Sequence, residues 1–271
     1  MSVRTTRIVV LGKTGAGKSS LGNTVFGESA FQANHSGKSG TIKCQAKQKP
    51  VREREIMWID TPGFFDTDKK EEEMKPEILR CITECAPGPH VFLILLKVEK
   101  YTKQEENLIK KILKYFTEIV FQHAIVVFTH GDQLDDGVRI EEFVSGSEAL
   151  SDLVKKCGNR QEVVDNKYWK SNEGDEYRSN NVHVEELLKT IDKVVMENNE
   201  ECFTSEMLQA VETEIEQEEM QIIQSSPNIS EEEIKCEAKN TVFRNQLIKA
   251  AGVTTVVMLR AFLRVMTPLW H

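Results

Sequence analysis

Gly12-Lys13-Thr14-Gly15-Ala16-Gly17-Lys18-Ser19 follows the apolar run at residues 7–11 and precedes a segment with helical character at residues 20–26. Strand, glycine-rich loop and helix in this order are typical of a phosphate-binding P-loop. Its backbone N–H groups converge on the β-phosphate, Lys18 brings a charge to the β- and γ-oxygens, and the Ser19 hydroxyl can hold Mg²⁺. The predicted nucleotide-binding residues of this stretch are Gly12, Lys13, Thr14, Gly15, Ala16, Gly17, Lys18, Ser19 and Ser20.

Composition limits the classes of function. The 271 residues include 35 Lys and Arg against 43 Asp and Glu, a net charge of -8. This balance argues against broad nucleic-acid binding, which needs a basic face. The 6 cysteines include no C-x-x-C pair. We therefore expect reduced thiols in a cytoplasmic protein without a secretory leader, and neither a disulfide framework nor a zinc site.

Two segments after the P-loop have the positions of nucleotide-sensing switches. Residues 27–40 are polar and rich in Gly and Ser, and Thr41 follows them as the candidate hydroxyl for Mg²⁺ and the γ-phosphate. The alternative for Thr41 is an ordinary surface loop. Asp60-Thr61-Pro62-Gly63 ends an apolar run, so Asp60 can reach a Mg²⁺ water and the Gly63 N–H can point at the γ-phosphate.

The residues after Gly63 bear on hydrolysis. Phe64-Phe65-Asp66-Thr67 stands where many small GTPases carry a glutamine that orients the attacking water. We therefore do not expect fast intrinsic hydrolysis.

A further polar cluster predicts the base. The apolar run 124–128 ends in Thr129-His130-Gly131-Asp132. Asp132 can accept hydrogen bonds from N1–H and the exocyclic amine of guanine, a pattern that adenine does not offer. Thr129 and His130 replace the Asn-Lys of the commoner Asn-Lys-x-Asp tetrapeptide; His130 either stacks on the base or caps the strand. An ATPase remains as a weaker alternative.

The pattern of apolar runs predicts an α/β fold. Buried runs at 7–11, 54–59, 90–96 and 124–128 alternate with helical stretches, and a strand at 42–51 is expected to pair with 54–59 in antiparallel fashion. This order predicts a mostly parallel sheet flanked by helices on both faces. A shorter run at 162–164 precedes Asp165-Asn166-Lys167, so the polar clusters gather at the carboxyl ends of strands. Helices are expected at 71–85, 102–116 and 182–198.

These motifs together resemble a known family. The order G-K-T-G-A-G-K-S-S, S-G-T-I-K-C, D-T-P-G-F-F-D-T, K-Y-T-x-x-E-E, T-H-G-D and G-N-R-x-x-x-x-D-N-K is similar to the immunity-associated GTPases (GIMAP or IAN proteins, the avirulence-induced class), relatives of septins and chloroplast import receptors. The resemblance implies a P-loop GTPase fold with a C-terminal helical extension, GTP/GDP and Mg²⁺ as ligands, and a nucleotide-dependent dimer. It also implies Asn166 as a second residue beside the base.

Two positions depart from the family pattern. The box that usually carries an arginine reads Glu99-Lys100-Tyr101-Thr102, and Lys100 keeps the charge without the planar guanidinium. Ala33 stands where the family often has a serine near the nucleotide. Binding is therefore better supported than turnover.

The composition changes after residue 200. We expect a GTPase domain at 1–200, an acidic helical extension at 201–246 and an apolar, basic C-terminal helix at 247–271. Ser230 opens a capping box. Two arginines, Arg260 and Arg264, disfavour a transmembrane span in the tail. A membrane-surface helix and a helix docked on the core or on a partner are equal alternatives.

The chain is thus predicted to be a guanine-nucleotide-binding switch protein. The catalytic candidates are Lys18, Thr41, Gly63 and Lys100, the Mg²⁺ candidates are Ser19, Thr41 and Asp60, and the base candidates are Thr129, His130, Asp132 and Asn166. We expect a slow GTPase that forms homodimers or hetero-oligomers within the family through its nucleotide face. The alternative is a non-hydrolysing GTP-dependent scaffold. A cytoplasmic location, with peripheral contact to an intracellular membrane through the tail, is expected.

Overall fold

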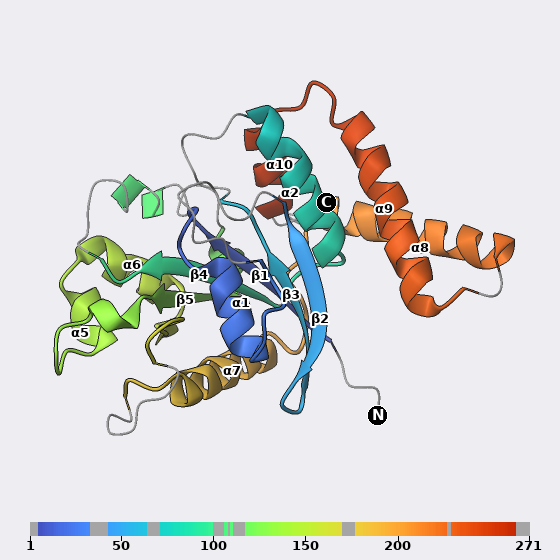
Figure 1. Cartoon of the computed structure of the whole chain (residues 1–271). Helices are drawn as coiled ribbons and strands as arrows, with labels where there is room; N and C mark the ends of the chain where they lie inside the picture. The colour runs from blue at the N-terminus through green and yellow to red at the C-terminus, as the bar shows by residue number, and fades with distance from the viewer. Residues whose placement is uncertain are drawn as a thin grey trace.

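The computed structural model describes residues 5–32, 43–63, 71–99, 106–107, 109–110, 117–169, 177–226 and 229–263. Across these residues a 6-stranded sheet has the order β2-β3-β1-β4-β5-β6 (Figure 1). Its strands are β1 (Thr6–Gly12), β2 (Gln45–Val51), β3 (Arg54–Asp60), β4 (Val91–Lys97), β5 (Ala124–Thr129) and β6 (Gln161–Val163). All neighbours are parallel except β2 and β3, which pair antiparallel as predicted.

The two faces of the sheet are both covered, which explains the continuous apolar runs. On one face, α1 (Lys18–Phe26) and α7 (Asn180–Glu197) pack on alternate residues of β1 and β4. On the other face lie α2 (Glu71–Cys85), α4 (Glu118–Gln122), α5 (Ile140–Ser145) and α6 (Glu148–Lys156). The central strands β4 and β5 therefore bury side chains on both sides, and every residue of β5 is buried.

The acidic extension forms two helices, α8 (Glu206–Ser225) and α9 (Glu231–Lys249), which pack on each other and on α2. The predicted capping box is confirmed, because Ser230 and Glu233 exchange side-chain and backbone hydrogen bonds at the start of α9. Lys239 Nζ donates to the Glu84 carbonyl at 2.8 Å, and the Arg80 guanidinium carbon lies 3.9 Å from the centroid of the Phe243 ring. These polar contacts fix α9 against α2.

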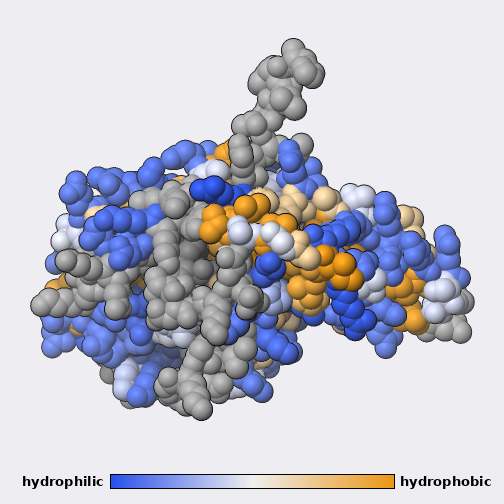
Figure 2. Space-filling view, turned by 90° about the horizontal axis from the view of Figure 1, so that it is seen from above, coloured by the Kyte–Doolittle hydropathy of each residue, from blue (hydrophilic) through white to orange (hydrophobic). Residues whose placement is uncertain are grey.

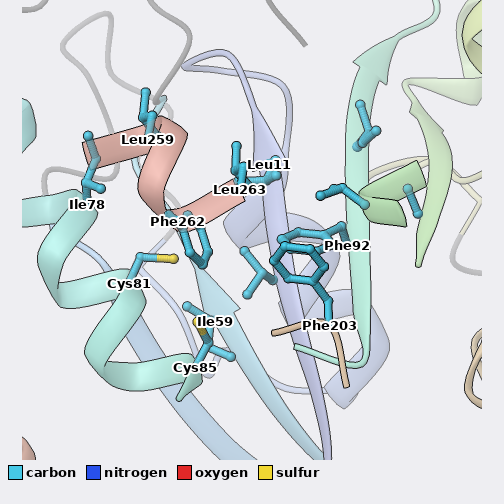
Figure 3. Close-up of a cluster of buried hydrophobic side chains, with 14 of the residues drawn as sticks. Leu11, Ile59, Ile78, Cys81, Cys85, Phe92, Phe203, Leu259, Phe262 and Leu263 are labelled. Carbon is cyan, nitrogen blue, oxygen red and sulfur yellow. The ribbon is translucent and has the colours of Figure 1, made fainter. Parts of the chain in front are cut away.

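The last described helix, α10 (Thr255–Leu263), is docked on the core (Figure 3). Met258, Leu259, Phe262 and Leu263 are buried, and the Phe262 ring lies 6.3 Å from that of Phe92, centroid to centroid. Of the two alternatives for the tail, docking therefore holds for residues 255–263. Arg264 and the rest of the tail lie outside the described residues.

Part of the molecular surface near this helix is apolar. Seen from above, hydrophobic residues gather on one area of the surface (Figure 2), and Val256 and Val257 of α10 are exposed. In the described part of the chain, none of the helices combines the length and hydropathy needed to cross a bilayer.

The element predictions succeed where apolar periodicity is strong. The strands, α2 and α7 were predicted within a few residues of their observed limits. Three short helices, α4, α5 and α6, were not predicted, and of the helix expected at 102–116 the structure describes only four residues. Ala33, Thr41, residues 64–67 and Lys100 also lie outside the described residues.

Candidate nucleotide site

The P-loop connects the central strand β1 to α1 at the carboxyl edge of the sheet. Gly15 and Gly17 have φ angles of 80° and 84°, which glycine adopts without the steric cost of a side chain. A Cβ on Gly12 would lie 2.8 Å from the Leu95 carbonyl oxygen, so a side chain does not fit there either. The glycine spacing thus follows from the path of this loop.

Lys18 folds back over the loop. Its Nζ donates to the carbonyl oxygens of Gly12 at 3.1 Å and Lys13 at 2.9 Å. Lys13 Nζ is directed elsewhere and donates to Glu99 Oε1 at 3.1 Å, after the end of β4. The ammonium of Lys18 therefore lies over the loop whose N–H groups would hold a phosphate chain.

The predicted Mg²⁺ ligands from two different elements meet. Ser19 Oγ, at the start of α1, donates to Asp60 Oδ2 at 2.5 Å, and Asp60 ends β3. Both residues are buried. A hydroxyl and a carboxylate are hard oxygen donors of the kind that Mg²⁺ prefers, so the residues present fit this ion. The neighbouring Thr61 is fixed by its own hydroxyl, which donates to the Val10 carbonyl at 2.5 Å.

The predicted base-binding loop is tied to the P-loop. Thr129 Oγ1, at the end of β5, donates to the Ala16 carbonyl at 2.9 Å. The same hydroxyl lies 3.0 Å from His130 Nδ1, within hydrogen-bond distance. His130 has φ 60° and is the N-cap residue of the turn η1 (Gly131–Gln133), but its side chain makes no capping hydrogen bond there. Its role, stacking on the base or capping the strand, stays a prediction.

Packing requires the glycine of the Thr129-His130-Gly131-Asp132 tetrapeptide. A Cβ on Gly131 would lie 2.4 Å from the Trp169 ring, and the Gly131 N–H donates to the Val164 carbonyl at 3.0 Å. Trp169 in turn stacks on His183 of α7 at a centroid distance of 5.3 Å. The base loop is thereby held by the segment that follows β6.

Asp132 has an acidic neighbour. Burial raises the pKa of Asp132 above its ordinary value, and a hydrogen bond with Asp165 raises this pKa further. Burial alone would raise the pKa of Asp165, but hydrogen bonds from Asp132 and from the amides of Tyr168 and Lys167 outweigh it and lower that pKa. The pKa values of the two carboxyl groups are therefore shifted in opposite directions, upward for Asp132 and downward for Asp165.

Asn166 lies between the P-loop and α1. Its Oδ1 accepts a hydrogen bond from Thr24 Oγ1 at 2.9 Å, and a Cβ on Gly17 would lie 3.0 Å from its Nδ2. The structure therefore places it beside the P-loop, on the same edge of the sheet as Thr129. Sequence reasoning missed Glu99 as the partner of Lys13, since no local motif links two residues so far apart.

A profile of the AIG1 family matches residues 6–224. The chain belongs to this family. Of the AIG1-like relatives, Immune-associated nucleotide-binding protein 8 of Arabidopsis thaliana is 34% identical over 251 residues, which cover 88% of this chain and 68% of that protein. GTPase IMAP family member 8 of Mus musculus is 31% identical over 199 residues, 73% of this chain but 28% of that protein. The resemblance inferred from the motifs is thus confirmed.

The fold has solved counterparts. Toc33 from Arabidopsis thaliana, crystallised with GDP and Mg²⁺, superposes with a TM-score of 0.54 at 21% identity and covers 71% of this chain and 85% of its own. This likeness establishes that the AIG1 chain has the P-loop GTPase fold, as predicted.

Proposed function

We propose that this protein is a guanine-nucleotide-binding switch that takes GTP or GDP together with Mg²⁺. The observation that carries the proposal is the meeting of Ser19 and Asp60 at 2.5 Å beside the P-loop. Asp132, on the same edge of the sheet, supports guanine as the base. The names of the relatives, which include a GTPase and nucleotide-binding proteins, support the same ligand class.

Two segments next to the proposed metal site would change conformation with the bound nucleotide. Asp60 ends β3 and is followed by Gly63, which is buried and can direct its N–H to a γ-phosphate. Thr41 is proposed as the hydroxyl of the other switch. Because α2 follows the second switch and carries α8, α9 and α10, a change there would be transmitted to the C-terminal helices.

The proposed reaction is a slow hydrolysis of GTP. Water would attack the γ-phosphate in line, with Lys18 and the P-loop N–H groups stabilising the charge that develops. Mg²⁺, when bound, supplies further neutralisation of the phosphate oxygens. Phe64 and Phe65 stand where a water-orienting glutamine is common, which is why the reaction is expected to be slow.

Dimerisation through the nucleotide face is part of the proposal. Toc33 is described as a protein for whose GTPase activity dimerisation is important. In this chain Lys100 is the cation that would face a partner's nucleotide, and it lacks the planar fork of arginine. A non-hydrolysing GTP-dependent scaffold is therefore the second candidate, favoured by the Phe64-Phe65 pair and by Lys100. A peripheral membrane contact and a cytoplasmic location stay proposals.

Two measurements test these statements. Titration of a fluorescent GDP, with ATP and GTP as competitors, should show displacement by GTP and none by ATP. Displacement by ATP would overturn the guanine assignment. Single-turnover phosphate release is then followed over a range of protein concentrations. A rate that rises with concentration supports the dimer-activated enzyme, and a flat rate near zero supports the scaffold.

A further inference from the structure

Lys97 lies beside the P-loop although it belongs to another strand. It is the last residue of β4, and the parallel register pairs it with Thr129 of the base loop. A Cβ on Gly15 would lie 3.9 Å from Lys97 Nζ. The Val98 N–H donates to the Thr129 carbonyl at 2.8 Å and fixes the backbone at this point. The Lys97 ammonium therefore lies between the phosphate loop and the base loop.

This ammonium differs from the other lysine groups around the loop. Lys18 Nζ is bonded to two loop carbonyls, and Lys13 Nζ is paired with Glu99. Lys97 is half-buried, and among the residues that the structure describes its Nζ has neither a hydrogen bond nor an ion pair. A half-buried ammonium gains most from an anionic partner, since burial weakens its hydration.

The base loop lacks the cation that its commoner form carries. His130 occupies the place of the lysine in Asn-Lys-x-Asp. Burial lowers the pKa of His130, and the charge of Lys97 lowers this pKa further, so the imidazole takes up a proton less readily than an exposed histidine. Lys97 therefore brings a positive charge to this side of the P-loop from outside the base tetrapeptide.

The geometry points to Lys97 as a further nucleotide-binding residue, whose ammonium contacts the phosphate chain beside Gly15 and replaces the missing lysine of the base tetrapeptide. The inference rests on the proposed binding of a guanine nucleotide. It assigns to Lys97 a charge interaction with the anionic part of the ligand. Selection of guanine over adenine stays with Asp132.

The charge of the ligand supplies the test. GTP, GDP and GMP carry the same base and sugar but differ in phosphate charge. Affinities are measured by competition against fluorescent GDP at low protein concentration with Mg²⁺, for the wild type and for Lys97→Met, Lys97→Arg and Lys155→Met. Lys155 is an exposed lysine of α6 and gives the matched control.

We expect Lys97→Met to lower the affinities for GTP and GDP by about tenfold, since a hydrogen bond to a charged group is lost. The affinity for GMP should fall less than the affinities for GTP and GDP. The affinities of Lys97→Arg should stay within about threefold of the wild type, because arginine keeps the charge. Those of Lys155→Met should equal the wild-type values. The loss should also shrink as salt is raised.

Results that would overturn the role of Lys97 can be distinguished from results that would overturn the proposed function. If the wild type binds GTP and GDP and Lys97→Met binds them equally well, the inference about Lys97 is wrong while the function stands. An equal loss for GTP, GDP and GMP would also overturn a phosphate contact. If the wild type binds none of the three nucleotides, the proposed function itself fails. Thermal unfolding without nucleotide shows whether Lys97→Met keeps the fold.

Discussion

Ser19 Oγ and Asp60 Oδ2 lie 2.5 Å apart although 41 residues separate them in the chain. The contact joins the start of α1 to the end of β3, so it links the phosphate loop to the strand that leads into the proposed second switch. A hydroxyl and a carboxylate this close are positioned to act on one Mg²⁺ ion, as proposed above. Their joint removal from solvent makes the pair sensitive to the loss of either oxygen.

Ser19→Ala is therefore expected to abolish the Mg²⁺ dependence of GTP binding. In the wild type, chelation of Mg²⁺ by EDTA should lower the affinity for GTP by about tenfold or more, because the ion that joins the protein oxygens to the phosphates is removed. In the variant, affinities with and without EDTA should agree. Ser145→Ala removes an exposed hydroxyl on α5 and serves as the control. A Mg²⁺ effect of full size in Ser19→Ala would contradict the assignment.

Asp132→Asn tests the choice of base. The amide can no longer accept both hydrogen bonds from guanine, so GTP affinity should fall by about 100-fold or more. Xanthine carries a carbonyl in place of the exocyclic amine, and the new amide can donate to it, so xanthosine diphosphate should gain affinity. Competition against fluorescent GDP measures both changes. Asp135→Asn makes the same substitution on an exposed neighbour and should alter neither.

The paired carboxyl groups predict a pH dependence. The proposed guanine contact needs Asp132 in its ionised form, and the pKa of this group is raised by burial and by Asp165. Below that raised pKa, binding must first release a proton, so GDP affinity should fall as the solution is acidified. Asp165→Asn removes the neighbouring charge but keeps Oδ1 as an acceptor for the backbone. The fall in GDP affinity on acidification should then begin at a lower pH.

Isothermal titration with GDP between neutral and mildly acidic pH measures this effect. The ratio of the two proteins' affinities cancels the titration of GDP itself. The same fall of GDP affinity with acidification in the wild type and in Asp165→Asn would show that the two carboxyl groups are not coupled.

The sequence predicts this site in part, and the reason for the limit is physical. Glycine spacing and the apolar runs of β1, β3 and β5 predict the P-loop, Asp60 and Asp132, because each lies where a strand ends. The place of Lys97 beside the P-loop, and the closeness of Asp165 to Asp132, become visible only when strands far apart in the chain are paired side by side. No local pattern encodes a contact made across a sheet.

The helices show the same limit. The apolar stripe of α7 is long, and it was predicted with nearly its observed bounds. The α5 and α6 helices have six and nine residues, too short for a stripe to stand out. The docking of α10 depends on the apolar side chains that α2 and the sheet present to it, which the tail's own residues do not reveal.

The docked helix α10 is expected to contribute to stability. Phe262 is 1% exposed, so Phe262→Ala should lower the free energy of unfolding by about 3 kcal/mol through lost burial and the cavity left behind. Val257 lies on the same helix and is 53% exposed, so Val257→Ala should have little effect. Denaturant unfolding measures both changes. Equal effects of the two substitutions would mean that α10 does not dock this way in solution.

Removal of the buried charge of Glu162, in β6, is expected to stabilise the fold at neutral and alkaline pH. Burial raises the pKa of Glu162 to about 7, although Thr190 Oγ1 donates to its Oε1 at 2.6 Å. The folded state therefore holds the proton more tightly than the unfolded chain. The resulting stabilisation is complete below the ordinary pKa of a glutamate and is lost as the pH rises through about 7.

Glu162→Gln keeps the acceptor for Thr190 and removes the buried charge. At pH 5 the variant and the wild type should have similar free energies of unfolding. At pH 8 the variant should be more stable by about 2 kcal/mol, a value reduced from the full shift because the side chain is partly exposed to water. Glu201→Gln, on an exposed loop residue, should show no such difference between the two pH values. A variant that is less stable than the wild type at pH 8 would show that Glu162 is stabilised in its ionised form by its surroundings.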